Sequence, residues 1–368
     1  MFPEKMEYYN SFKGYKMKQY TGMSADDVWR MAVSDLMEYP EYESSTRGGE
    51  TVELLQCTLS ISDPKQRWIS SRKPVYNPAF GLVEFIWIFN GENDSDVLRF
   101  WNPKLPDFSG SSKILHGAYG YRLRKGFGID QIQRAYLALK SNHTSRQVVL
   151  QIWSPCCDLP DEHGQPSSND IPCNLMSLLT IRRGRLFWTQ VMRSNDAMRG
   201  LPYDIIQFTL LQEFFASWLG CEMGDYVHLS NSLHIYNDCI EKYSVDLESK
   251  PIKESNESLQ LNISFEDTTH YLSAIYKDLT TIPQLQSEPC KEKIRNQLYR
   301  IFAPNSPTNL NKPPLLCNIL CVIGSDASRR LCDEEFAICL LKKCTDAKLQ
   351  LVAMNWLKRN SKTGSGNA

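Results

Sequence analysis

Residues 193–204 read RSNDAMRGLPYD and residues 223–238 read MGDYVHLSNSLHIYND, and these two stretches decide the fold. The first follows a strand-like run, Arg185–Met192, and leads into a long apolar segment. Its Arg193 and Ser194 form a pair that suits a phosphate group. An acidic residue at a helix start is also an ordinary cap, so each signal is weak alone. Their weight comes from the segments around them.

The surrounding chain alternates between helical and strand-like patterns. Apolar spacing predicts helices over Ser24–Met37, Asn77–Asn90, Asp130–Lys140 and Tyr203–Leu219, with a further helix from His234 to Glu241. It predicts strands over Thr51–Ser62, Gln147–Trp153, Leu175–Ile181, Arg185–Met192 and, briefly, Val227–Leu229. The helix at Asn77–Asn90 is apolar on nearly every face, which predicts deep burial.

The pattern changes after about Asn262. Clusters of Pro, Ser and Asn separate short amphipathic segments at Tyr271–Leu279, Lys291–Phe302, Leu315–Ile323 and Glu334–Leu341. We therefore expect three regions: a catalytic domain over 1–262, a helical extension over 263–360 and a Gly/Ser-rich, disordered tail over 361–368.

Two residues are out of place in this pattern. Glu84 lies inside the apolar helix, where a charged and unpaired carboxylate costs several kcal/mol. An internal salt bridge would explain it as well as a function. Cys173 follows a proline and precedes a strand, and taken alone an inert buried thiol is the more common case.

Taken together, the motifs resemble the thymidylate synthase family over roughly residues 47–241. RSNDAMRGLPYD resembles its Arg-Ser-x-Asp run and Gly-Leu-Pro-aromatic-Asn, and the second stretch its Gly-Asp-aromatic-Val and His-x-Tyr. IWSP resembles the family's Trp-Asn-Pro, and IPCN resembles its Pro-Cys-His. VEFIWIFNG resembles the family's Glu-containing helix, and AYGYRLR resembles one of its Tyr-Gly motifs. The resemblance implies an α+β fold, with a large mixed sheet and a long buried helix, to which this chain adds a helical C-terminal extension.

The resemblance also implies a site for folate-dependent transfer to pyrimidine C5. Cys173 would add to pyrimidine C6 as a thiolate, favoured by the charge of Arg193. Glu84 and Tyr119 would move protons around the ring. The nucleotide would be held by Arg47, Arg146 from the partner of a homodimer, Arg193, Ser194, Asp204, His234 and Tyr236. The cosubstrate methylenetetrahydrofolate would be held by Asp196, Trp87 and Tyr203.

Asp204 stands where the family carries an asparagine that reads uracil. A carboxylate accepts from the amino group of cytosine and opposes O4 of uracil. The cytidylate hydroxymethylases related to the family share this change, so we expect CMP or dCMP as substrate. A drifted helix cap at Asp204 is the plain alternative.

The outcome at C5 depends on whether hydride or water reaches the reacting carbon. Where thymidylate synthases place a tryptophan, this chain has Leu105-Pro106-Asp107, which favours water and a hydroxymethyl product. This chain also departs from the family's pattern at Asn174, Gln147 and Met192. It shows no counterpart of the apolar C-terminal tail with which the family covers the folate. A C5-methyltransferase acting on dUMP or dCMP and a non-catalytic nucleotide binder remain as alternatives, and ribose and deoxyribose are both open.

Composition limits the partners. The 41 basic and 42 acidic residues nearly cancel, so no basic excess indicates nucleic-acid binding. The sequence contains no run of 18 apolar residues, so no membrane span is predicted. No secretory segment opens this long chain, which favours free thiols in a cytoplasmic protein over disulfides for its 12 cysteines. The six cysteines of the extension lack paired C-x-x-C spacing, which argues against a metal site there.

Overall fold

The computed structural model describes residues 17–46, 48–106, 110, 112–246, 261–331 and 333–361. Three of the sequence expectations fall outside these ranges: Arg47, Asp107 and nearly all of the tail after residue 361.

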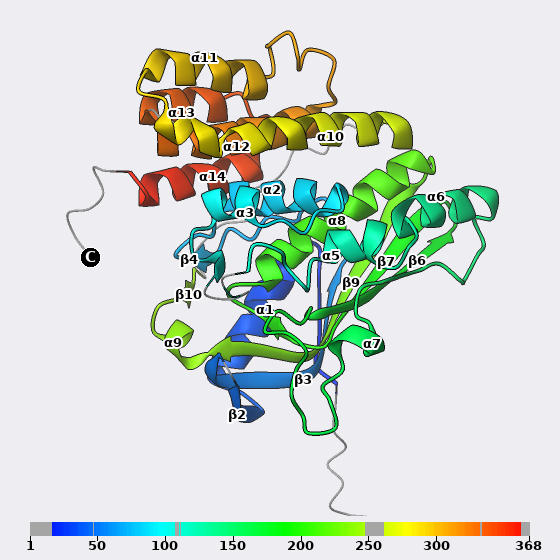
Figure 1. Ribbon diagram of the computed structural model, residues 1–368. Helices are drawn as coiled ribbons and strands as arrows, with labels where there is room; N and C mark the ends of the chain where they lie inside the picture. Colours follow the sequence, from blue (N-terminus) through cyan, green and yellow to red (C-terminus); the bar gives the residue numbers. More distant parts are fainter. Residues whose placement is uncertain are drawn as a thin grey trace, which may run out of the picture.

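The fold is built on one mixed sheet of eight strands (Figure 1). The strands run in the order β1-β3-β9-β7-β6-β5, with β2 paired to β3 and β8 to β9. Their bounds are β1 Gln19–Gly22, β2 Tyr42–Thr46, β3 Gly49–Ile61, β5 Val149–Gln151, β6 Asn174–Arg182, β7 Arg185–Met192, β8 Asn195–Asp196 and β9 Glu222–Tyr236. A separate pair joins β4, Arg72–Lys73, to β10, Ser244–Val245. The predicted α+β class with a large mixed sheet is confirmed.

One strand differs clearly from its prediction. The sequence indicated a short strand at Val227–Leu229 and a helix from His234, but β9 is 15 residues long and includes His234 and Tyr236. The strand is long because it pairs with β3 on one side and with β7 on the other. Tertiary pairing therefore outweighs the weak local pattern. Only α9, Asn237–Ile240, is helical in the predicted segment.

Two apolar helices form the middle layer of the molecule: α8 packs against β7 and β9, and α2 packs on α8. In α2, Pro78–Phe89, every residue except Glu84 is buried, and Asn77 caps the start through its side chain. In α8, Leu201–Trp218, nearly every side chain is also buried. The two helices pack on each other, with Phe85 and Phe214 stacked at a centroid distance of 5.7 Å.

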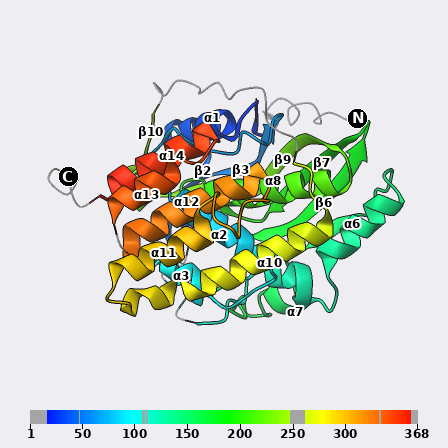
Figure 2. The same cartoon turned by 90° about the horizontal axis from the view of Figure 1, so that it is seen from above.

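The C-terminal helices form a further layer over α2 (Figure 2). They are α10 Phe265–Thr281, η2 Pro283–Ser287, α11 Lys291–Phe302, α12 Pro314–Leu331, α13 Glu334–Leu341 and α14 Ala347–Arg359. The predicted helical C-terminal region is confirmed, although α14 was not predicted. An apolar α2 requires cover on two sides, and α8 and the C-terminal layer supply it.

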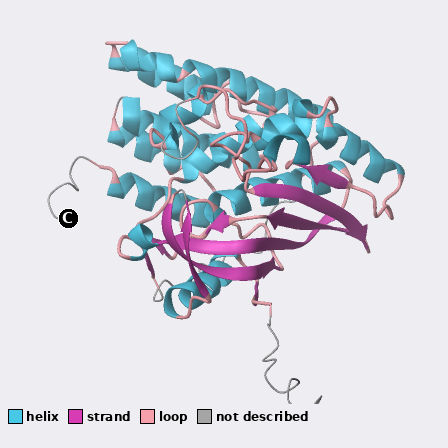
Figure 3. Ribbon diagram, turned by 60° about the horizontal axis from the view of Figure 1, so that its bottom comes forward, coloured by secondary structure: helices cyan, strands magenta, loops and turns pink. Residues whose placement is uncertain are grey.

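The remaining helices are shorter or lie at the edges of the sheet. They are α1 Ala25–Glu38, α3 Asp96–Trp101, α5 Tyr119–Tyr121, η1 Arg122–Gly126, α6 Gln131–Ser141 and α7 Pro155–Asp158. Ser24 caps α1 in a capping box with Asp27. Figure 3 shows how most helices gather on one side of the sheet.

Candidate active site

The sheet order brings three distant sequence motifs to one place. Because β6 and β7 are antiparallel, the start of β6 lies beside the end of β7, with Asn174 opposite Met192. Because β7 and β9 are parallel, the end of β7 also lies beside β9, with Met192 opposite Ser230. Cys173 therefore lies next to Arg193, and β8 continues along β9 to His234.

Arg193 holds the loop that carries Cys173. Its Nε donates to the carbonyl of Pro172 at 3.0 Å, and its Nη2 donates to the carbonyl of Ile171 at 3.0 Å. The same Nη2 lies 3.8 Å from Cys173 Sγ. A second tie comes from Asp170, whose carboxylate accepts from the backbone N–H of Gly117 at 2.9 Å. The thiol is thus fixed from both sides of the loop.

The thiol of Cys173 is not activated in the free protein. Burial raises its pKa above the usual value, the charge of Arg193 lowers it, and the charges of Asp204, Asp170 and Asp196 raise it. The sequence led us to expect that Arg193 would favour the thiolate, and the charge has that sign. Burial and three nearby carboxylates outweigh it.

Glu84 faces α8 from the middle of α2. Gln207 Nε2 donates to its Oε2 at 2.5 Å. Burial and the charge of Asp204 raise the pKa of Glu84 to about 8, while the Gln207 hydrogen bond lowers it. No ion pair to Glu84 occurs among the described residues, so the salt-bridge explanation for a carboxyl group inside this apolar helix does not hold.

Asp204 lies in the first turn of α8 with 6% of its surface exposed. Asn195 Nδ2 donates to its Oδ2 at 2.7 Å. Burial raises the pKa of Asp204 to about 7, and the Asn195 hydrogen bond lowers it. The backbone N–H groups of the preceding turn, at Met198 and Arg199, are instead accepted by Asp196 at 2.8 Å each. Within the described ranges, no hydrogen bond therefore supports the helix-cap interpretation of Asp204.

Tyr119 completes this group from α5. Burial raises the pKa of its phenol well above the usual value, as do the charges of Asp204, Cys173 and Glu84. Its hydroxyl therefore stays protonated across neutral pH.

The predicted phosphate and sugar ligands lie along β8 and β9. Ser194 Oγ lies 3.4 Å from His234 Nδ1, and the His234 and Tyr236 rings meet edge to face at 5.2 Å. Burial lowers the pKa of His234, so the imidazole is neutral at pH 7. Gly48, the residue after Arg47, lies against the ring of Tyr236.

The remaining predicted ligands of the nucleotide and the folate are Arg146, Trp87 and Tyr203. Arg146 is exposed at the end of β5 opposite to Cys173, because Val149 pairs with Leu178 far along β6. Trp87 is 3% exposed, with its Nε1 bonded to the carbonyl of Asp94. Tyr203 is partly exposed, and its hydroxyl accepts from the backbone N–H of Asn77 at 3.2 Å.

Sequence reasoning missed two polar partners, Asn195 and Gln207. Both are 2% exposed, and each bonds a carboxyl group of the site. A buried amide on an apolar helix was visible at Gln207, but its partner on α2 was not. The amide of Asn174, at the family's histidine position, accepts from Gln190 Nε2 at 2.6 Å.

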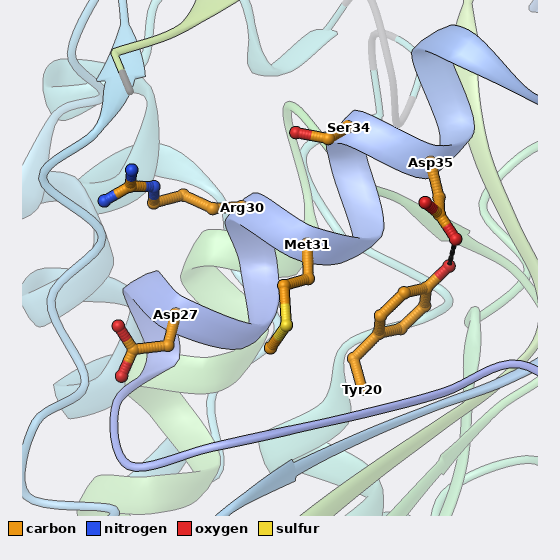
Figure 4. A pocket seen from close by; sticks show the side chains of 6 residues that line it. All are labelled: Tyr20, Asp27, Arg30, Met31, Ser34 and Asp35. Atoms are coloured by element: carbon orange, nitrogen blue, oxygen red, sulfur yellow. Dashed lines mark hydrogen bonds between the residues drawn. The ribbon is translucent and has the colours of Figure 1, made fainter. Parts of the chain in front are cut away.

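A separate surface hollow of about 590 Å³ lies over α1 (Figure 4). It is lined by Tyr20, Asp27, Arg30, Met31, Ser34 and Asp35, and the Tyr20 hydroxyl donates to Asp35 at 2.7 Å. The site side of α1 is different, since Trp29 Nε1 donates to the carbonyl of Ala197 at 2.7 Å. None of the predicted site residues lines this hollow. The candidate active site is therefore identified by the reactive side chains that lie together and not by a surface pocket.

Among the described residues, no three His, Cys, Asp or Glu side chains are grouped closely enough to hold a metal ion. No helix in the described ranges combines the length and apolar character that crossing a membrane requires.

Comparison with known proteins finds a family model described as thymidylate synthase, which matches residues 31–289. A deoxyuridylate hydroxymethyltransferase of Pseudomonas phage M6 is 33% identical over 180 residues, 48% of this chain and 50% of the relative. A protein of the same name from Bacillus phage SP01 is 29% identical over 235 residues, 58% of this chain and 60% of the relative. A thymidylate synthase of Francisella philomiragia subsp. philomiragia is 30% identical over 195 residues, which are 49% of this chain and 69% of the relative. The chain thus spans between half and three fifths of the two phage relatives.

Proposed function

Because the chain belongs to the thymidylate synthase family, we propose that it transfers a one-carbon unit to C5 of a pyrimidine nucleotide. The observation that carries this proposal is the convergence of Cys173, Arg193, Glu84 and Asp204 from four separate elements. A mere nucleotide binder has no use for a thiol and a proton relay held together in this way. The non-catalytic alternative is therefore the weaker one.

Cys173 would be the nucleophile. Its Sγ would bond to C6 of the pyrimidine, and C5 would then carry the electron density needed to attack a one-carbon donor. The thiol must first lose its proton. Arg193 is 3.8 Å away and lowers the pKa of the thiol, and it would keep one face toward the nucleotide phosphate.

Glu84 and Tyr119 would handle the protons. A carboxyl group with a pKa of about 8 can both accept and return a proton near neutral pH. The protonated phenol of Tyr119, near both Glu84 and Cys173, would assist loss of the C5 proton. These roles remain proposals for the chain's own residues.

Methylenetetrahydrofolate would supply the one-carbon unit. Asp196 and Tyr203 are partly exposed at the site and suit its polar and aromatic ring. Asp196 Oδ1 accepts from two backbone N–H groups and Oδ2 lies 3.9 Å from Arg199 Nε, so a donor on the folate would share this carboxylate with Arg199. Trp87 is 3% exposed, so little of its ring is available to contact the folate.

The nucleobase would be read by Asp204. As a carboxylate, it complements the amino group of cytosine, which favours CMP or dCMP. The names of the phage relatives favour a second candidate, dUMP. A protonated Asp204 would also suit uracil, since its hydroxyl can donate to O4 while its carbonyl accepts from N3–H.

A hydroxymethyl product is the outcome that the relatives' names favour. The reaction balances as nucleotide, methylenetetrahydrofolate and water giving hydroxymethyl nucleotide and tetrahydrofolate. The segment Leu105-Pro106, which lacks an aromatic ring, agrees with entry of water.

We also propose a homodimer. Arg146 is exposed and lies away from the site of its own chain, as expected of a residue that serves a partner. The edge of the sheet beside it exposes apolar side chains, with Val149 at 42% and Leu178 at 37%. A cytoplasmic location and the division at residue 262 stay predictions.

The test is product analysis with the full chain. Purified protein is incubated with methylenetetrahydrofolate and CMP, dCMP, UMP or dUMP, and product masses are measured. We expect a gain of one CH2O unit on a cytidine nucleotide, and no product from Cys173→Ala.

The outcomes separate the candidates. A gain on dUMP alone would transfer the proposal to deoxyuridylate, and a gain of CH2 would mean methylation. Absence of any product, with Cys173→Ala binding nucleotides like the wild type, would contradict the enzyme and leave the binder.

A further inference from the structure

The side chain of Asn195 touches the proposed base reader directly and has no part in the mechanism above. Its Nδ2 lies 2.7 Å from Asp204 Oδ2. It is 2% exposed and Asp204 is 6% exposed. The NH2 end of the amide faces Asp204, which is the orientation that favours the ionised carboxylate.

The pair is held rigidly by the elements that carry it. Asn195 is in β8, where it pairs with Leu233 of β9. Asp204 is in the first turn of α8, where its backbone N–H donates to the carbonyl of Gly200 at 3.1 Å. Within the described part of the chain, Asn195 is the one hydrogen-bond donor to this carboxylate, so Oδ1 is left for a ligand.

We propose that Asn195 sets the nucleobase preference of the site by holding Asp204 as an acceptor-only carboxylate, which suits the amino group of cytosine and opposes O4 of uracil. The inference rests on the proposed role of Asp204 as base reader. It makes Asn195 a specificity-determining residue that acts through its neighbour.

The physical reason is the competition that decides the charge of Asp204. Burial favours the neutral acid, and the hydrogen bond from Asn195 favours the carboxylate. The groups that face Asp204 from other elements do not add a cation. They are Glu84 on α2, Tyr119 on α5, Tyr226 on β9 and Cys173 before β6. Without the Asn195 amide, nothing in this group would keep the carboxyl ionised.

A second observation points to a ligand or water beside the pair. The Oδ1 of Asn195 is fully buried and accepts no hydrogen bond from any described residue. A buried acceptor without a partner is unfavourable by about 1–3 kcal/mol. A donor brought in with the nucleotide, such as an amino group or a bound water, would satisfy it.

The experiment compares Asn195→Leu with the wild-type full chain. Leucine has the same branched shape and no polar atom, so it removes the hydrogen bond while keeping a side chain that fills the site. Binding of CMP, dCMP, UMP and dUMP is measured by calorimetry at pH 6 and pH 8. We expect the cytidine-to-uridine affinity ratio at pH 8 to fall about tenfold, the size of a lost hydrogen bond to a charged group.

Two controls separate specificity from simple damage. Asn309→Leu removes a buried asparagine whose Nδ2 bonds the carbonyls of Ile301 and Ala303 in the C-terminal layer, and it should leave the ratio unchanged. In the double variant Asn195→Leu/Asp204→Asn, the ratio should equal that of Asp204→Asn alone, because Asn195 then has no carboxylate to act on.

A direct titration keeps the inference testable even if no nucleotide binds. The Asp204 carboxyl carbon, identified by its absence in Asp204→Asn, is followed by carbon NMR in the ligand-free protein. Its titration midpoint should move to higher pH in Asn195→Leu. An unmoved midpoint together with an unchanged ratio would overturn the inference. A wild type that prefers uridine nucleotides, with a ratio that still shifts in Asn195→Leu, would contradict only the cytidine assignment.

Discussion

Asp204 should make the stability of the ligand-free protein depend on pH. Burial raises its pKa to about 7, whereas an unfolded aspartate has a pKa near 3.8. Between these values the unfolded chain releases a proton that the folded chain keeps, so the free energy of unfolding falls as pH rises from about 4 to about 7. Above about pH 7 the loss of stability caused by burying the ionised Asp204 no longer changes with pH.

Asp204→Asn removes this penalty. We expect the variant to gain about 2–4 kcal/mol relative to wild type on going from pH 4 to pH 8, measured by urea unfolding. The gain should vanish at the acidic end of the range. Asp238→Asn is a suitable control, because the pKa of that exposed carboxyl is lowered, chiefly by Lys242. A wild type whose stability relative to Asp204→Asn does not change with pH would contradict the raised pKa.

Gln207 should matter to catalysis through Glu84. Its Nε2 donates to Glu84 and lowers the pKa of that carboxyl. Gln207→Leu should therefore move the Glu84 limb of the kcat/KM profile to higher pH and lower kcat about tenfold or more. Gln212→Leu, on the same helix, loses only bonds to backbone carbonyls, those of Leu186 and Gly224 among them. It should lose stability and keep its pH profile, and a matching shift in both variants would exclude the specific role.

Single residues were predictable from sequence only where a motif contains them. Cys173, Arg193 and Asp204 belong to motifs with fixed spacing, so the order of motifs along the chain was enough to group them in one site. Asn195 belongs to the same stretch as Asp204, and Gln207 acts on Glu84 of another helix, but in both cases the contact exists only after the sheet and the helices pack. No local pattern in the chain encodes such a pairing.

At the scale of elements, the contact of α5 with α2 depends on Gly120. A Cβ on this residue would collide with the backbone carbonyl of Ile88, which cannot move without breaking α2. Tyr119 reaches the site only because the two helices approach this closely. Gly120→Ala should therefore lower stability by about 3 kcal/mol and reduce kcat, since Tyr119 would be displaced.

Gly128→Ala provides the comparison for this prediction. Gly128 has a φ of +74°, and no atom lies within 4 Å of the position that a Cβ would take, so alanine there meets strain and no collision. We expect about 1 kcal/mol of destabilisation and an unchanged kcat, measured by urea unfolding and initial rates. Equal losses in the two variants would mean that close packing at Gly120 is not decisive.

The elements themselves were predicted unevenly, for a physical reason. Helices α1, α2 and α6 carry their own capping residue and apolar spacing, α11 carries the apolar spacing alone, and the structure places all four within a residue or two of the prediction. The long β9 carries a mixed pattern, with His228 and Ser230 turned into the core, and its length comes from two partner strands. Local propensity is a poor guide where pairing supplies the stability.

At the scale of the molecule, the C-terminal layer is bound to the catalytic part through buried polar contacts as well as apolar ones. Asp326 on α12 is 1% exposed and pairs with Arg329 and Arg330. The same carboxylate accepts from Asn77, the cap of α2, at 3.4 Å. From α14, Arg359 donates to the carbonyl of Val75 at 2.9 Å. These contacts lie close to the start of the helix that carries Glu84.

Deletion of residues 263–368 should therefore also destabilise the catalytic part of the chain. It would expose the side of α2 that the C-terminal layer covers, and an apolar helix surface of this kind promotes association. We expect a truncated protein that elutes as aggregates, binds a hydrophobic dye and lacks a cooperative unfolding transition. Deletion of residues 362–368 alone removes none of the described contacts and should behave as the full chain does. A monodisperse, cooperatively unfolding 1–262 fragment would contradict this dependence and make the extension a domain of its own.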